Sequence, residues 1–116
     1  MIRVRRVYET PLAEDGERLL IDRLWPRGLT KANARIDRWA RELAPGDELR
    51  TWFGHDPERF PRFRERYRGE LLQHREALIE LARESSRRPV TLVFAAKDEH
   101  HSNATVLKEL LDELGD

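Results

Sequence analysis

The segment from Val90 to Ala96 constrains the fold most, because it is a continuous apolar run, partly β-branched, that directly follows Pro89. A run of this length is typical of a strand that is covered on both faces, as the strands of parallel sheets are. Within the segment from Arg18 to Leu24, the triplet Leu19-Leu20-Ile21 is a second such run. We therefore expect two buried strands, with the Val90 strand near the centre of the sheet.

Apolar residues at helical spacing predict one long helix after Asp56-Pro57, which supply its N-cap and first helical position. Pro61 would strain that helix from inside, so we expect its first turn to be separate. His74 lies on the stripe and is expected to be a core histidine. The stripe consists of Phe60, Phe63, Tyr67, Leu71, His74, Leu78 and Leu81.

Shorter elements are expected in the first half of the chain. Ile2 to Tyr8 alternates apolar and basic residues until Arg5-Arg6, which predicts a strand with a bulge at that pair. Thr30 is expected to cap a short helix. The segment from Ile36 to Leu43 fits either a strand or a helix.

Two further helices complete the expected fold. Asp47 to Phe53 predicts a short helix that Gly54 ends in a left-handed conformation, and Ser102 or Asn103 is expected to cap a C-terminal helix. Together these elements predict an α/β fold. We expect a small, largely parallel sheet of three to four strands covered by helices, with one long amphipathic helix and a C-terminal helix.

Composition narrows the class of protein. The 116 residues suit one domain, 1–116, and the 22 basic and 22 acidic residues cancel, which argues against nucleic acid as a partner. The chain has no cysteine, so disulfides, thiolate nucleophiles and cysteine-ligated metals are excluded. No apolar run is long enough to span a membrane, and Met1 to Tyr8 lacks a signal-peptide pattern. We therefore expect a cytoplasmic protein with no membrane partner, and the oligomeric state is left open.

Two polar loops directly follow the two expected buried strands, Asp22 to Gly28 and Lys97 to Asn103. Ligands of open α/β sheets bind beyond the carboxyl ends of the strands, where loops lead into helix N-termini with free N–H donors. Such loops gather at one edge when the strands run parallel. We therefore expect a common cleft there, lined by Asp22, Arg27, Arg50, Lys97 and His101.

In the first loop, Asp22 and Arg23 can orient each other, which leaves Arg27 free to hold an anion through two hydrogen bonds. The alternative is that Asp22 and Arg23 form a structural ion pair that closes the loop, while Trp25 only caps the core.

The second loop brings acid–base and hydrogen-bonding groups next to a helix N-terminus, whose dipole favours anions. His101 is the candidate general base, and Asp98 is expected to orient it. The alternative is that the polar side chains of this loop only cap the helix. The groups are Lys97, Asp98, His101 and Asn103.

A third candidate is His55-Asp56, which follows Arg50 and Trp52 on the expected short helix, although Asp56 has a sufficient role as a helix cap. Five side chains offer ligands for zinc or manganese, but none of the usual H-x-x-x-H or H-E-x-x-H spacings is present, so we expect no metal site. The sequence leaves the identity of any cofactor unknown. The five are His55, Asp56, Asp98, His100 and His101.

The strings D-R-L-W-P-R-G at 22–28, W-F-G-H-D-P at 52–57 and A-A-K-D at 95–98 resemble the YeaO-like family of uncharacterised bacterial proteins, domain of unknown function 488. The resemblance covers nearly the whole chain and implies a compact cytosolic α/β domain with no established substrate. In the family, the motif A-A-K-D often continues E-H-N after the aspartate. Here the run after Asp98 differs, and Ser102 stands in the usual Asn place. The motif positions matched are Asp22, Arg23, Trp25, Arg27, Gly28, Arg50, Trp52, His55, Lys97, Asp98 and His101.

Two functions follow from these observations. The leading hypothesis is a binder of a small anionic or nucleotide-like ligand at the strand ends, with His101 and Asp98 as the catalytic pair if the protein is an enzyme. The alternative is a non-catalytic module that binds protein or nucleic acid through exposed Trp25, Trp52 and nearby arginines. The ligand-binding residues of the leading hypothesis are Asp22, Arg23, Trp25, Arg27, Gly28, Arg50, Trp52, His55, Lys97 and Asn103.

Overall fold

The computed structural model describes residues 1–115 and is built on a four-stranded sheet in which all neighbouring strands are parallel. The strand order β1-β4-β2-β3 places β4 and β2 inside the sheet, and β4 is buried at every position. The expected α/β class and the central place of the Val90 strand are therefore confirmed. The strands are β1 (Ile2–Arg6), β2 (Glu17–Leu20), β3 (Arg38–Trp39) and β4 (Val90–Phe94).

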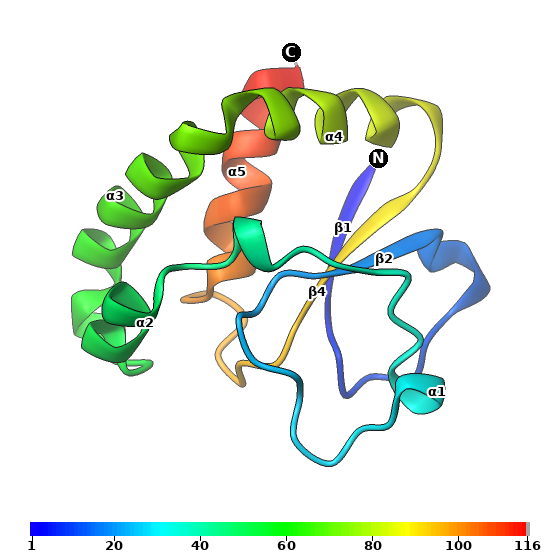
Figure 1. Cartoon of the computed structure of the whole chain (residues 1–116), viewed down its shortest axis with the longest axis horizontal. Helices are drawn as coiled ribbons and strands as arrows, with labels where there is room; N and C mark the ends of the chain where they lie inside the picture. The colour runs from blue at the N-terminus through cyan, green and yellow to red at the C-terminus, as the bar shows by residue number, and fades with distance from the viewer. Residues whose placement is uncertain (116) are drawn as a thin grey trace.

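The helices are α1 (Lys31–Ala34), α2 (Asp47–Phe53), α3 (Phe60–Leu71), α4 (Arg75–Arg87) and α5 (Asn103–Gly115). Figure 1 shows α3, α4 and α5 together on one side of the strands, and α1 with the loop before it on the other. No helix within residues 1–115 is long and apolar enough to cross a membrane. In the described part of the chain, 3-10 turns lie at Ala13–Asp15, Arg41–Leu43, Pro57–Arg59 and Leu72–His74.

The hydrophobic core has two unequal parts. The larger lies between the sheet and helices α2 to α5, and includes Leu19, Leu92 and Phe94. The smaller holds Val93 on the opposite face, with side chains of the segment 25–36 packed against it. A helical layer therefore covers one face of the sheet, and mostly irregular chain covers the other.

The short elements agree with the sequence pattern in most places. The Thr30 hydroxyl accepts the Asn33 N–H at 3.1 Å, as an N-cap does. Helix α2 has the expected bounds, and Gly54 follows it at a φ of 53°. The segment 36–43 contains both the two-residue strand β3 and a 3-10 turn. The expected bulge at Arg5-Arg6 is wrong, because both residues stay in register with β4.

The long apolar stripe lies on two helices, α3 and α4, joined by the 3-10 turn Leu72–His74. The first turn of the path is separate, as Pro61 predicted, and forms the 3-10 turn Pro57–Arg59. The expectation that His74 lies in the core is wrong, because its side chain is exposed. At the junction no element packs closely against His74, and a hollow remains beside it.

Parallel pairing brings the ends of the strands to one edge of the sheet. The last residue of β1, Arg6, pairs with Phe94, and the last residue of β2, Leu20, pairs with Val93 and Trp39. The loops that follow the four strands therefore leave from the same edge, which we call the carboxyl edge.

A buried ion pair fixes the opposite end of β2. Arg18 and Asp15 are almost fully buried, and the Arg18 guanidinium lies 2.7 Å from the Asp15 carboxylate. The same guanidinium donates to the carbonyls of Ala34 and Arg35 at the end of α1. Burial alone would raise the pKa of Asp15, but the Leu12 N–H, Arg18 and Arg5 together hold that pKa below its ordinary value. Arg18 thus joins β2, α1 and the turn before β2.

We expect Arg18→Met to lower the free energy of unfolding by about 3–5 kcal/mol, because it leaves the Asp15 carboxylate buried without its charged partner. Urea unfolding at neutral pH measures the loss. The control is Arg3→Met, whose contact with Glu14 is 4.0 Å long and exposed, and which should cost less than about 1 kcal/mol. Equal losses in the two variants would contradict the role assigned to Arg18.

Candidate functional site

The carboxyl edge is organised around the side chain of Asp22, the second residue after β2. One carboxylate oxygen accepts the Ala95 N–H at 2.9 Å, and the other accepts the Asn103 side-chain amide at 2.9 Å. The same amide also donates to the Ile21 carbonyl at 2.9 Å. Asp22 and Asn103 therefore tie the end of β2, the end of β4 and the first residue of α5 together.

Asp22 and Arg23 do not form the expected pair. The Arg23 Nε donates to the Pro45 carbonyl at 3.3 Å and lies 3.6 Å from the Asp47 carboxylate. Asp22 turns towards α5 instead, because the buried amide of Asn103 and the N–H of Ala95 need an acceptor there. The loop is closed by a hydrogen-bonded carboxylate and not by an ion pair.

The environment of Asp22 alters the acidity of its carboxyl group. Burial raises its pKa above the ordinary value, while the Asn103 amide, the Ala95 N–H and the charge of His55 act in the opposite direction. Burial likewise raises the pKa of Tyr67 well above its ordinary value, and the nearby charge of Asp22 adds to this effect. Buried carboxyls with a raised pKa at strand ends occur in functional sites and in structural networks.

The loop before α5 holds an aspartate–histidine pair. The Asp98 carboxylate accepts the N–H groups of His100 and His101 at 3.1 Å, and lies 2.7 Å from the His101 Nδ1. The hydrogen bond from His101 is the main cause that holds the pKa of Asp98 below its ordinary value. Asp98 therefore orients His101 and accepts N–H groups of the loop before α5, while the Ser102 hydroxyl accepts the Thr105 N–H at 3.4 Å and caps the helix.

His55 and His101 come from separate segments, and each lies against one ring of a neighbouring aromatic pair. The His101 ring meets Phe60 edge-on, with centroids 5.2 Å apart. The His55 ring lies 6.1 Å from Phe53, and Phe53 lies 6.1 Å from Phe60. His55 follows Gly54 at a positive φ of 59°, which turns it back onto Phe53. We call His55, His101, Phe53 and Phe60 the histidine surface.

The expected cationic residues are spread along the edge. Arg27 is exposed on its loop, where its carbonyl accepts the Tyr8 hydroxyl at 3.0 Å. Arg50 is exposed on α2 and lies 3.5 Å from Asp47. Figure 1 shows the loop between β2 and α1 and helix α2 in different places around the strands. Lys97 is exposed in the loop after β4.

Two tryptophans of the expected site are already engaged within the chain. Trp25 is half-buried, donates from Nε1 to the Leu29 carbonyl at 2.7 Å and meets Trp39 edge-on. Trp52 is half-buried, with the guanidinium groups of Arg59 and Arg66 5.4 and 5.1 Å from its ring.

Gly28 has a φ of 79° and no atom near its Cβ position, so its role in the loop is conformational.

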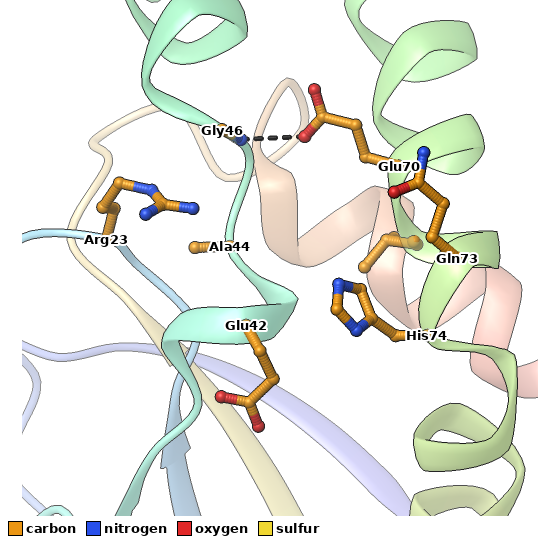
Figure 2. Close-up of a pocket in the computed structure, with 8 residues that line it drawn as sticks. Arg23, Glu42, Ala44, Gly46, Glu70, Gln73 and His74 are labelled. Carbon is orange, nitrogen blue, oxygen red and sulfur yellow. Dashed lines mark hydrogen bonds between the residues drawn. The ribbon is translucent and has the colours of Figure 1, made fainter.

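The structure also has a hollow of about 170 Å³ that the sequence did not reveal. Figure 2 shows it between Arg23, the segment Glu42–Gly46 and the junction of α3 and α4. A second hollow, of about 400 Å³, lies along α5 beside Val4. Of the residues expected to bind ligand, Arg23 alone lines either of these two hollows. In the part of the chain that the structure describes, no three His, Asp or Glu side chains group closely enough to hold a metal ion.

We expect Asn103→Asp to destabilise the fold more strongly as the pH rises. It sets two carboxyls face to face, so one must keep a proton and its folded-state pKa rises above the unfolded value. Stability is then retained below the unfolded pKa and lost as the pH rises through the folded pKa. Thermal unfolding between pH 4.5 and 8 measures the difference from the natural chain. Asn33→Asp, at an exposed position on α1, is the control, and equal pH profiles would contradict the network.

The whole chain has clear relatives. The family model described as the inactive DUF488-N3 subclade matches residues 1–115. The uncharacterised protein Rv3073c of Mycobacterium tuberculosis is 44% identical over 111 residues, which cover 96% of this chain and 93% of that protein. The uncharacterised protein YeaO of Escherichia coli is 39% identical over 113 residues, covering 97% and 98% of the two chains. No solved structure matches the chain. The chain therefore belongs to the YeaO-like DUF488 family, in the subclade described as inactive.

Proposed function

We propose that this protein is a non-catalytic binder of a small anionic ligand, and that the ligand contacts the histidine surface with Lys97 beside it. The proposal depends on one observation: His55 and His101 are 46 positions apart in the sequence, and each contacts one ring of the neighbouring Phe53–Phe60 pair. Exposed polar groups from different loops that converge beyond parallel strands are typical of ligand sites in α/β folds.

The arrangement of His101 suits an anion. Asp98 holds its Nδ1, so Nε2 remains to contact a ligand. A protonated imidazole donates a charge-assisted hydrogen bond to phosphate, sulfate or carboxylate oxygens. Phe60 covers one side of the ring, which limits competition from water there. Lys97 precedes Asp98 in the same loop and adds a positive charge.

Binding fits the surroundings of the site better than catalysis does. The Asp22 carboxylate already accepts hydrogen bonds on both oxygens, so it has no free acceptor to serve as a second acid–base group beside His101. The description of the matching family as an inactive subclade supports the same choice.

We further propose a cytoplasmic location, which suits a chain without cysteine.

Sulfate is a suitable probe, because its charge is constant between pH 5.5 and 8 while histidine side chains ordinarily gain a proton in that range. We expect saturable shifts of the His101 and His55 ring signals in NMR titrations, with tighter binding at the lower pH. His101→Ala and His55→Ala should each weaken binding about fivefold, or roughly 1 kcal/mol.

The matched control is His100→Ala, which removes an exposed histidine one position away and leaves the Asp98–His101 pair in place. It should bind sulfate as the natural chain does. Equal weakening in all three variants, or affinity that does not change with pH, would contradict the histidine surface as the binding site.

The interaction module is the second candidate, and the stacking of Arg59 and Arg66 around Trp52 favours it. Arginine and tryptophan are enriched at binding hot spots, and bases stack on such groups in single-stranded nucleic acid complexes.

If this surface binds nucleic acid, a dT oligonucleotide should quench tryptophan fluorescence with an affinity that falls steeply with salt. Arg66→Gln should weaken the binding, while Arg83→Gln on α4 should not. No quenching at low salt would exclude nucleic acid as the partner.

A further inference from the structure

The hollow at the α3–α4 junction is a separate feature that shares no residue with the histidine surface. It lies between Arg23, the segment Glu42–Gly46 and the turn at Gln73 and His74, and has a volume of about 170 Å³. Figure 2 shows Arg23 and Glu70 extending towards Gly46 from opposite sides, with the His74 ring turned towards the segment Glu42–Gly46. Groups from distant parts of the sequence therefore meet around one small space.

The hollow offers a positive group on one side. The Arg23 Nε donates to the Pro45 carbonyl and lies near Asp47. These contacts use Nε and leave the two terminal nitrogens of the guanidinium to face other groups. The two nitrogens can hold a carboxylate through two parallel hydrogen bonds.

The opposite side offers a negative group in a fixed position. One oxygen of Glu70 accepts the Gly46 N–H at 2.8 Å, as the dashed line in Figure 2 marks. That bond orients the carboxylate and leaves its second oxygen available to accept from a ligand. Glu70 lies on α3, and a helical backbone keeps it at a constant place relative to the hollow.

Two polar side chains and a second carboxylate also line the hollow. The carboxylate is Glu42, whose charge is paired with Arg38 at 2.8 Å. Gln73 and His74 are exposed, and neither side chain forms a hydrogen bond with another of residues 1–115. They are held at the hollow because the 3-10 turn Leu72–His74 separates α3 from α4. Such a turn within a helical path often marks a functional position.

The size of the hollow limits the ligand to a small one, since pockets for drug-sized molecules are about 300–1,000 Å³. We propose that the hollow binds a free α-amino acid with a polar side chain. The ligand carboxylate lies against Arg23, its ammonium group against Glu70, and its side chain meets Gln73 or His74. The opposite charges on the two sides are the feature that selects a zwitterion over a simple anion.

L-serine is the first probe, and the readout is the backbone N–H signals of Gly46 and Gln73 in ¹⁵N-resolved NMR spectra. We expect saturable shifts with a dissociation constant below about 10 mM. N-acetyl-L-serine lacks the ammonium group and L-serinamide lacks the carboxylate, so each should bind at least about tenfold more weakly. L-alanine should also bind more weakly than L-serine.

Glu70→Gln is the sharpest variant, because an amide oxygen still accepts the Gly46 N–H while the charge is lost. This variant should weaken the binding of L-serine about tenfold and leave the weak binding of N-acetyl-L-serine unchanged. Glu65→Gln, an exposed position on the same helix, is the matched control and should have no effect. Unchanged chemical shifts away from the hollow verify that each variant is folded.

Three results would overturn the proposal: no saturable shift of Gly46 or Gln73 with any probe, equal binding of L-serine and N-acetyl-L-serine, or equal effects of Glu70→Gln and Glu65→Gln. His101→Ala should leave L-serine binding intact. The test is therefore independent of the histidine surface, and failure at either place leaves the other standing.

Discussion

The hydrogen bonds of the Asp22 carboxylate hold the carboxyl edge of the sheet together. The parallel strands β2 and β4 end side by side, and their next residues would otherwise leave unpaired backbone groups in a half-buried position. Asp22 accepts a hydrogen bond from the Ala95 N–H, the first one beyond the paired residues of β2 and β4. It also accepts one from the side-chain amide of Asn103 at the start of α5. Because α5 starts from Asn103, the position of the preceding Asp98–His101 loop follows from the same contacts.

Strand β2 carries a buried or half-buried aspartate near each end, and the two carboxyls respond differently. Asp15 lies against Arg18, and the charges and hydrogen bonds around it outweigh burial, so its pKa falls. Asp22 has only neutral donors in contact, so burial dominates and its pKa rises. Ionised Asp15 adds stability that is lost as the pH falls through its folded pKa, while ionising Asp22 takes stability away as the pH rises. Two arginines act on the Asp15 carboxyl in addition to a backbone N–H, and no arginine acts on Asp22 in the same way.

The sequence revealed the elements whose signals are local. The Val90 run, the Thr30 cap and the helix from Asp47 to Gly54 depend on residues close together in the chain, and each agrees with the structure. The sequence also placed Asp98 beside His101, because they are three positions apart in one loop. Parallel pairing then explains why the loops after the strands share one edge.

Contacts between distant segments were not predictable in the same way. Asp22 was expected to meet Arg23, its neighbour, but its partners are 73 and 81 positions away. The placement of His55 against Phe53 and of His101 against Phe60 depends on the left-handed backbone at 54 and 55 and on the path of α3. Arg27 and Arg50 were expected to converge, which stays a prediction; the contact that the structure gives Arg50 is with Asp47. Residue type alone does not specify which of several polar partners a side chain meets.

His74 shows how an error in the expected core still carried information. The spacing of the stripe gave the direction of its side chain, since Leu71 and Leu78 on either side of it are buried. Spacing does not say whether another element packs at that point, and here the segment Glu42–Gly46 stays apart and leaves a hollow. An apolar residue at this position would lose the stabilisation that burial gives, whereas a histidine keeps its hydrogen-bonding groups in water or against a ligand. A polar residue within an apolar stripe therefore marks a position where the core is open.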